Sequence, residues 1–187
     1  TVRGMDALIT PNHKLVTARG LVKAEHLLES DRVILMGNAV DGSEQTYQDS
    51  LVELAGWIIT EGCYESNENG IKRIVVYQNR GSKADRIRDC LISLGYRFSE
   101  SKSKNIAFAI CREDSRDLAR LLPNKNLTMD FILSLTAEQR ELLINTMIDG
   151  DGWRVGKNRR YVQKSKEGVD MFQVLCTLAG IKTNTHH

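Results

Sequence analysis

Two stretches of the sequence share one pattern and decide the fold: Leu54–Gly62, which reads LAGWIITEG, and Ile144–Gly152, which reads INTMIDGDG. In each, a mostly apolar run ends in an acidic residue followed by glycine. Residues 51–60, which contain the apolar part of the first run, carry a single charge, at Glu53. A run that is apolar almost all round is typical of a helix buried on most sides. The sequence therefore predicts two buried helices that end at Glu61 and Asp151.

These acidic helix ends predict a metal site. A carboxylate at a helix C-terminus lies beside partial negative charge, and two such ends brought together repel each other. A divalent cation between Glu61 and Asp151 would relieve both penalties, and the carbonyls of Thr60 and Gly150 could add ligand oxygens. Oxygen ligands suit Mg²⁺, with Mn²⁺ a possible substitute. The small pair Ala55–Gly56 would let two helix backbones approach closely. For a single copy, a solvated acid at the tip of an ordinary helix is the simpler interpretation, but two copies in register favour the metal.

A second similarity recurs at a constant offset of 85 residues. Gln78 corresponds to Gln163, and Gly95 corresponds to Gly180. Both copies run from a basic strand through the glutamine and a polar turn into an amphipathic helix that ends at the glycine. A duplicated unit predicts pseudo-twofold symmetry within a monomer, which suits a nearly twofold ligand such as duplex DNA.

Local patterns place the remaining elements. Alternating or β-branched runs predict strands, and apolar spacing near 3.6 residues, bounded by Thr, Gly or Pro, predicts helices. The expected strands are 6–10, 14–17, 31–35, 71–77, 96–101 and 105–111, and the expected helices are 51–60, 83–94, 115–122 and 136–148. The Gly-containing polar stretch 37–48 is expected to be a linker.

Composition bounds the function. The 187 residues are 41% apolar, which is enough for a core, and no apolar stretch is long enough to predict a membrane span. The four cysteines are scattered without a CxxC pair, which argues against a zinc ribbon or a disulfide scaffold. We expect reduced thiols and a cytoplasmic location, or a nucleoid or nuclear one, wherever the host DNA lies.

Charge is distributed unevenly. Residues 1–66 carry five basic and ten acidic side chains, whereas 67–187 carry 21 basic and 14 acidic ones. The excess is concentrated at 71–105 and 154–168, with nine basic residues against three acids and six against one. Local clusters of this kind favour a nucleic-acid partner, and a solvated basic face is the alternative.

The two acid-ended motifs resemble the signature motifs of LAGLIDADG homing endonucleases in their single-chain, two-motif form. The second motif departs from the pattern, with Asn145–Thr146 in place of Ala-Gly. The resemblance covers 49–187 and implies an α+β fold of duplicated αββαββ units, forming a saddle over double-stranded DNA. Repeat one would span 49–134 and repeat two 135–187, the latter without the last strands and helix of the first.

The resemblance also implies an activity and its residues. The activity is Mg²⁺-dependent cleavage of both strands at a long site that lacks the mobile element. Glu61 and Asp151 would hold the metals, Lys125 would be the catalytic lysine, and Gln78 and Gln163 would order water. A surface-loop lysine and polar strand residues are the alternative interpretations of the last three.

The expected DNA-binding residues lie on the strands of the two saddle halves. On the first half they are Lys72, Arg73, Tyr77, Arg80, Arg97, Lys102 and Lys104, and on the second Arg154, Lys157, Arg159, Arg160, Tyr161 and Lys164.

The N-terminal part, 1–48, resembles the TxxH block of intein (Hint) splicing domains through Thr10 and His13, followed by Arg19-Gly20 and Asp31-Arg32-Val33. In that family the Thr and His activate the upstream peptide bond. The sequence starts with no Cys or Ser nucleophile and ends with no His-Asn, so we expect part of a splicing domain, or a relic of one, rather than splicing by this chain alone. Three alternatives to an active endonuclease stay open: a DNA-binding protein that no longer cuts, an RNA maturase, and a fragment of a protein-splicing intein.

Overall fold

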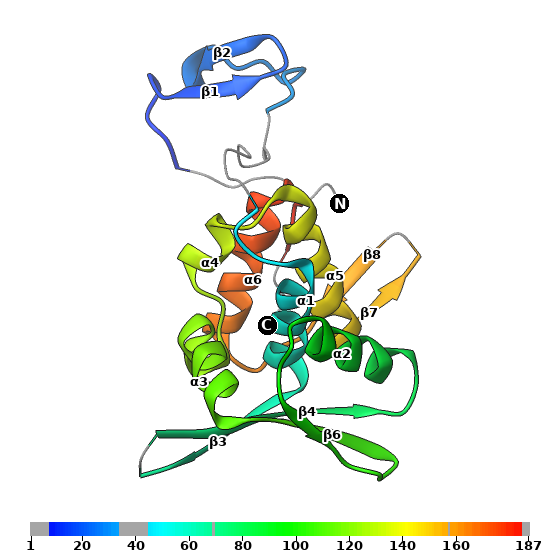
Figure 1. Ribbon diagram of the computed structural model, residues 1–187. Helices are drawn as coiled ribbons and strands as arrows, with labels where there is room; N and C mark the ends of the chain where they lie inside the picture. The colour runs from blue at the N-terminus through cyan, green and yellow to red at the C-terminus, as the bar shows by residue number, and fades with distance from the viewer. Residues whose placement is uncertain (1–7, 34–44, 69, 157, 185–187) are drawn as a thin grey trace.

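The computed structural model describes residues 8–33, 45–68, 70–156 and 158–184 (Figure 1). In the first of these ranges, β1 (Lys14–Thr17) and β2 (Gly20–Lys23) form an antiparallel hairpin, and the short 3-10 helix η1 (Ala24–His26) follows. Thr17 also forms an isolated antiparallel bridge with Val33.

The strands predicted on either side of this hairpin were largely wrong. Residues 8–10 are not in a strand, because Thr10 begins a turn: its carbonyl accepts from His13 N, and its hydroxyl donates to Asn12 Oδ1 at 2.8 Å. Such local bonds compete with a sheet ladder. The strand predicted at 31–35 is reduced to the bridge at Val33, and 6–7 and 34–35 lie outside the described residues.

The larger part starts with a unit of one helix, a sheet and two further helices. Helix α1 (Asp49–Glu61) leads into strands β3 (Gly62–Asn67) and β4 (Gly70–Asn79), and α2 (Ser82–Ser93) follows. Strands β5 (Phe98–Glu100) and β6 (Asn105–Ile110) and helix α3 (Arg112–Leu121) complete the unit. The sheet order is β3-β4-β6-β5, with every pair antiparallel (Figure 1). The αββαββ order implies the strand β3, but local sequence patterns did not locate its residues, because they are largely polar.

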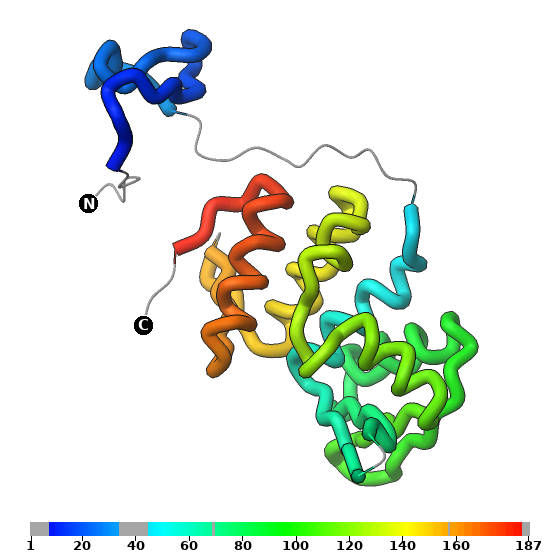
Figure 2. The backbone as a smooth tube through the Cα atoms, turned by 90° about the vertical axis from the view of Figure 1, so that its left-hand side faces the viewer, coloured from blue at the N-terminus to red at the C-terminus, as the bar shows by residue number. Residues whose placement is uncertain are grey.

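A second unit follows through a short connection. The 3-10 helix η2 (Pro123–Lys125) and helix α4 (Met129–Leu133) lead to α5 (Ala137–Asp151), strands β7 (Gly152–Val155) and β8 (Asn158–Tyr161), and helix α6 (Lys166–Leu178). Helix α5 begins at a reciprocal capping box, in which the Thr136 hydroxyl accepts from Gln139 N and the Gln139 side chain accepts from Thr136 N. Helix α6 packs against α5 (Figure 2).

The same hydrogen bonds recur at the predicted offset of 85 residues. At the end of α2, Gly95 N donates to Ile92 O and Tyr96 N to Leu91 O. At the end of α6, Gly180 N donates to Thr177 O and Ile181 N to Cys176 O. Both glycines have positive φ, 69° and 72°, which a residue with a side chain adopts only at a cost. The two units therefore share the order helix, two strands, helix, and the way in which the second helix ends.

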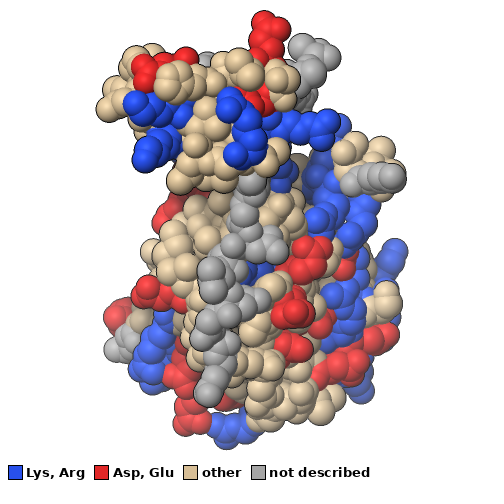
Figure 3. All heavy atoms as spheres, turned by 90° about the horizontal axis from the view of Figure 1, so that it is seen from above, with Lys and Arg blue, Asp and Glu red and all other residues tan. Residues whose placement is uncertain are grey.

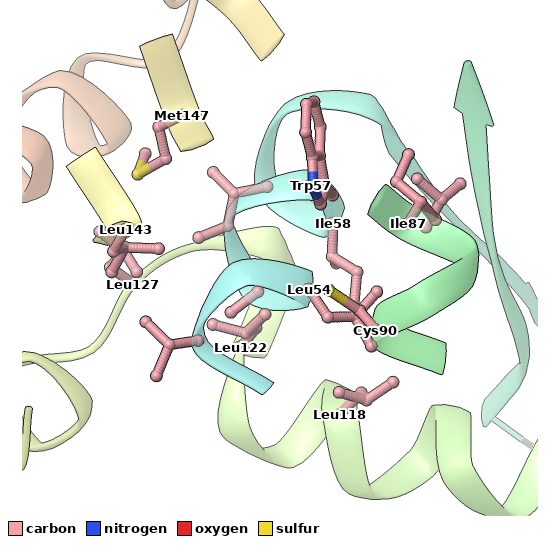
Figure 4. Close-up of a cluster of buried hydrophobic side chains, with 14 of the residues drawn as sticks. Leu54, Trp57, Ile58, Ile87, Cys90, Leu118, Leu122, Leu127, Leu143 and Met147 are labelled. Atoms are coloured by element: carbon pink, nitrogen blue, oxygen red, sulfur yellow. The ribbon is translucent and has the colours of Figure 1, made fainter. Parts of the chain in front are cut away.

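Helix α1 is the centre of the core, and residues 54–60 are all buried. Its Leu54, Trp57 and Ile58 pack toward Ile87 and Cys90 of α2, while Leu143 and Met147 of α5 lie on its other side (Figure 4). The buried, all-round apolar helix predicted here is confirmed, as is the mixed α+β architecture with antiparallel sheets. None of the helices in the described residues combines the length and apolar character needed to cross a membrane.

Candidate metal and nucleic-acid site

The site depends on how closely α1 and α5 approach each other. A Cβ added to Gly56 of α1 would lie 2.8 Å from Thr146 Cγ2 of α5, and a Cβ added to Gly150 would lie 2.2 Å from Thr60 Oγ1. Each glycine therefore accepts the threonine at the equivalent position of the other motif. The Thr146 that departs from the Ala-Gly pattern does not prevent close packing, because it fits against the glycine of the first motif.

This packing brings the two acidic helix ends together. Each helix passes directly into a strand at a glycine, Gly62 or Gly152, where a Cβ would lie 2.3 Å from a backbone carbonyl oxygen. Burial raises the pKa of Glu61, and the nearby negative charge of Asp151 raises it further. Burial also raises the pKa of Asp151. The structure thus keeps two mutually repelling carboxylates in a partly buried place.

This pair of carboxylates suits a divalent cation. Bound positive charge would offset both the burial and the repulsion, and carboxylate and carbonyl oxygens are the ligands that Mg²⁺ prefers. Glu61 and Asp151 would hold the ion, with Thr60 O and Gly150 O as further oxygen donors. The part of the chain that the structure describes contains no group of three or more His, Cys, Asp or Glu side chains placed to hold a metal.

Two of the residues predicted to act at the site, Gln78 and Lys125, lie beside the carboxylate pair of Glu61 and Asp151. Gln78 Nε2 of β4 donates to Glu61 Oε1 at 3.3 Å, and the Gln78 Oε1 atom is held by Asn79 N. Lys125 Nζ donates to Thr60 O at 3.3 Å, and its charge lowers the pKa of both carboxyls against the larger effect of burial. Lys125 and Asn124 have φ of 63° and 53°. These left-handed conformations are costly for residues other than glycine, so the turn that carries the lysine is strained.

A second lysine lies at the site and was missed by the sequence analysis. Lys83, at the start of α2, donates from Nζ to the carbonyl of Asp149, and its charge lowers the pKa of Glu61. The repeat offers no signal for it, because the residue 85 positions later is Gly168. Only the approach of α2 to the end of α5 brings Lys83 here.

The predicted Gln163 is oriented differently from Gln78. Both glutamines accept from the next backbone N–H, but Gln163 Nε2 donates to Tyr161 OH at 3.4 Å. Tyr161 is stacked on Phe172 of α6, with ring centroids 4.2 Å apart. Burial raises the pKa of Tyr161 to about 12. The hydrogen bond from Gln163 opposes this rise, and the negative charge of Asp151 adds to it. Tyr161 is thus directed toward the helices.

The basic residues predicted to bind DNA on the first half are partly paired. Arg73 forms two hydrogen bonds with Glu65, Arg97 is paired with Glu113, and Arg80 donates to Lys102 O. Lys72, Arg73 and Arg97 line one open depression of about 610 Å³. The other predicted residues of this half, Tyr77, Lys102 and Lys104, are exposed.

On the second half, the predicted arginines face different ways. Arg154 pairs with Asp149 at 3.2 Å, and Arg159 pairs with Glu141, so both face α5. Arg160 lies over the Trp153 ring, 5.7 Å from its centroid, and Lys164 is exposed. Lys157 lies outside the described residues. Figure 3 shows acidic and basic side chains interspersed along the right-hand side of the molecule.

In the N-terminal hairpin, Thr10 and His13 share one turn and both are exposed. The better-anchored group there is Asp31, which accepts from Arg19 Nε at 2.6 Å and from Leu28 N at 2.9 Å. Hydrogen bonds from Arg19 and then from Leu28 lower the pKa of Asp31 to about 2.

Comparison with known proteins shows that solved structures share this fold. No protein-family model matches the chain. The structure is similar to the crystal structure of I-DmoI in complex with DNA and Mn, with a TM-score of 0.55 and 14% sequence identity over 74% of this chain and 81% of that one. It is also similar to mesophilic variants of the homing endonuclease I-DmoI, with a TM-score of 0.51 and 13% identity over 68% of this chain and 75% of that one. The chain therefore shares the α+β fold of a homing endonuclease.

Proposed function

We propose that this protein is a divalent-metal-dependent endonuclease that hydrolyses phosphodiester bonds at a specific site in double-stranded DNA. The observation that carries the proposal is the pair of carboxylates, Glu61 and Asp151, held together at the ends of two packed helices with a lysine beside them. The fold shared with I-DmoI, which has been crystallised with DNA and Mn and with DNA and Ca, supports it.

In this proposal each side chain has a defined task. Bound Mg²⁺, or Mn²⁺ in its place, would activate water and neutralise charge on the leaving oxygen. Glu61 and Asp151 hold the ion. Lys125, fixed on Thr60 O, offers positive charge to the phosphate as its negative charge develops. Gln78, fixed at its own Oε1 by Asn79 N, orients Glu61 and a water molecule beside it.

The proposal is tested with a library of randomised duplexes, incubated with Mg²⁺ or with chelator. We expect Mg²⁺-dependent double-strand breaks in one sequence class, which Asp151→Asn abolishes. The matched control is Asp117→Asn, which removes an exposed helical carboxylate that is paired with Arg120. Specific binding without breaks, unchanged by Asp151→Asn, would show a DNA-binding protein that does not cut and would refute the endonuclease.

We further propose that the endonuclease promotes the homing of an intein, with residues 1–48 containing part of a splicing domain. Thr10 and His13 support this, because a single turn exposes both. Sequencing of the encoding gene on both sides of this segment tests it. A preceding Cys or Ser at a splice junction and a following His-Asn are expected, and a gene without them would contradict an intein.

A further inference from the structure

Strands β7 and β8 form a two-stranded ribbon that lies beside α5 (Figure 1). In the register, Trp153 is opposite Arg160 and Val155 is opposite Asn158. Because side chains alternate across a strand, these four share one face, and Arg154 and Arg159 share the other face with their partners on α5. Val162, whose N–H bonds to Asp151 O, continues the ladder on the first face.

That face is unusually apolar for an exposed surface. Trp153 is 45% exposed, Val155 57% and Val162 55%. Its described members include no carboxylate, and the Arg160 guanidinium lies over the Trp153 ring. On the open face of the first sheet, Tyr77 is 39% exposed, its neighbour Val75 on the same strand is buried, and Arg73 is paired with Glu65. An exposed set of several large apolar side chains is therefore found on the described ribbon of the second half and not around Tyr77.

We propose that this face reads thymine methyl groups in the major groove of the half-site next to Asp151, so that this half of the DNA target is rich in thymine and the other half is not. The inference rests on the proposed function. Apolar contact with the C5-methyl group is how exposed aliphatic and aromatic side chains recognise thymine, and a two-stranded ribbon fits the major groove. Arg160 and the exposed Lys164 supply charge that complements the phosphates.

The register gives the spacing of the contacts. Val162 lies level with Asp151, Trp153 two residues further along the ribbon, and Val155 two residues beyond that. Two residues of strand span roughly 6.7 Å, which is about two base pairs of duplex. The contacted thymines are thus expected about two base pairs apart, beginning beside the cleavage position and extending about four base pairs outward.

The test uses the target found in the duplex library and replaces each thymine with deoxyuridine, which lacks only the methyl group. In the half-site of β7 and β8, each contacted position should lose affinity about four-fold, the factor that corresponds to about 0.8 kcal/mol for one buried methyl. Val155→Thr and Val162→Thr, which keep the shape but lose the apolar contact, should bind the thymine and deoxyuridine duplexes almost equally. The matched control is Val16→Thr, an exposed strand valine of the N-terminal hairpin (50% exposed), which should keep the full preference.

The inference is overturned if the half-site lacks thymine at these spacings, or if deoxyuridine is tolerated while binding and cleavage are otherwise normal. The second result would leave the endonuclease intact. If no duplex in the library is bound at all, both proposals fail. A concentration-dependent dimer that Val162→Thr dissolves would also overturn it, because the face would then bind a second copy of the chain.

Discussion

Substitution of Gly150 by alanine is expected to destabilise the protein and to inactivate it. The new Cβ would lie 2.2 Å from Thr60 Oγ1 and 2.5 Å from Thr60 Cβ. Thr60 cannot easily rotate away, because its hydroxyl donates to Gly56 O at 3.0 Å inside a buried helix. The helices must therefore separate, and the carboxylates that follow Thr60 and Gly150 separate with them.

The magnitude follows from two opposing effects. Overpacking of a tight core costs about 1–3 kcal/mol, and the two shortest contacts place this site at the upper end. Replacing glycine by alanine within a helix returns about 1 kcal/mol. The net loss is about 2 kcal/mol in the free energy of unfolding, or about 4–8 °C in melting temperature for a chain of this size.

The assay is thermal and urea unfolding of Gly150→Ala, of Thr60→Gly and of the exchanged pair Thr60→Gly/Gly150→Thr. The exchanged pair should recover most of the stability, because it places the threonine side chain on α5 at position 150 and removes the one on α1 at position 60 that would collide with it. Gly168→Ala serves as control: it lies in α6, where the added Cβ would meet mainly the flexible Gln163 side chain at 3.1 Å, and it should not destabilise. Wild-type stability for Gly150→Ala, or no recovery in the exchanged pair, would refute the packing argument.

Three further predictions concern charge. Glu61→Gln and Asp151→Asn should abolish cleavage yet raise the melting temperature at neutral pH, because a raised pKa means that the folded state favours the uncharged form of the carboxyl group. For the same reason, the stability of the wild-type protein without metal should increase as the pH falls from neutral toward those raised pKa values. Melting curves without metal that show the reverse trend would contradict this prediction. Lys125→Met should slow single-turnover cleavage by about 10²–10³-fold with little loss of DNA affinity, whereas an unchanged rate would remove the lysine from the mechanism. Since the pKa of Asp31 lies below its unfolded value, its contribution to the hairpin is present above about pH 4 and lost as pH falls toward 2; Arg19→Met should raise that pKa in an NMR titration, and an unmoved value would exclude the ion pair as its cause.

Sequence patterns were sufficient to predict helices and repeated units where many residues follow the same apolar or repeated pattern. Helix α1 is apolar almost all round, which predicted a helix buried on most sides, and its residues 54–60 are all buried. The offset of 85 residues predicted matching helix ends at Gly95 and Gly180, and the same backbone hydrogen bonds are found there. Both signals are strong because each depends on many residues at once.

Signals that depend on tertiary approach could not be recognised in advance. Strand β3 is polar and follows β4 through pairing, and Lys83 reaches the site only because α2 lies against the end of α5. Positive charge alone did not show that Arg154 and Arg159 would turn toward acids on α5. Strand alternation assigns the two arginines to one face, but the sequence does not say which face is covered.

The different orientations of Gln78 and Gln163 have a kinetic consequence. Gln78 lies in β4 and Gln163 lies two residues after the end of β8; both accept from the N–H of the next residue, yet one amide is bonded to a carboxylate and the other to a phenol. The two strands of a duplex would then meet unequal chemistry, and Gln78→Ala should slow the cutting of one strand more than that of the other. In a time course, circular DNA carrying a single break would accumulate before the linear product, so an internally duplicated chain would act in sequence rather than at once.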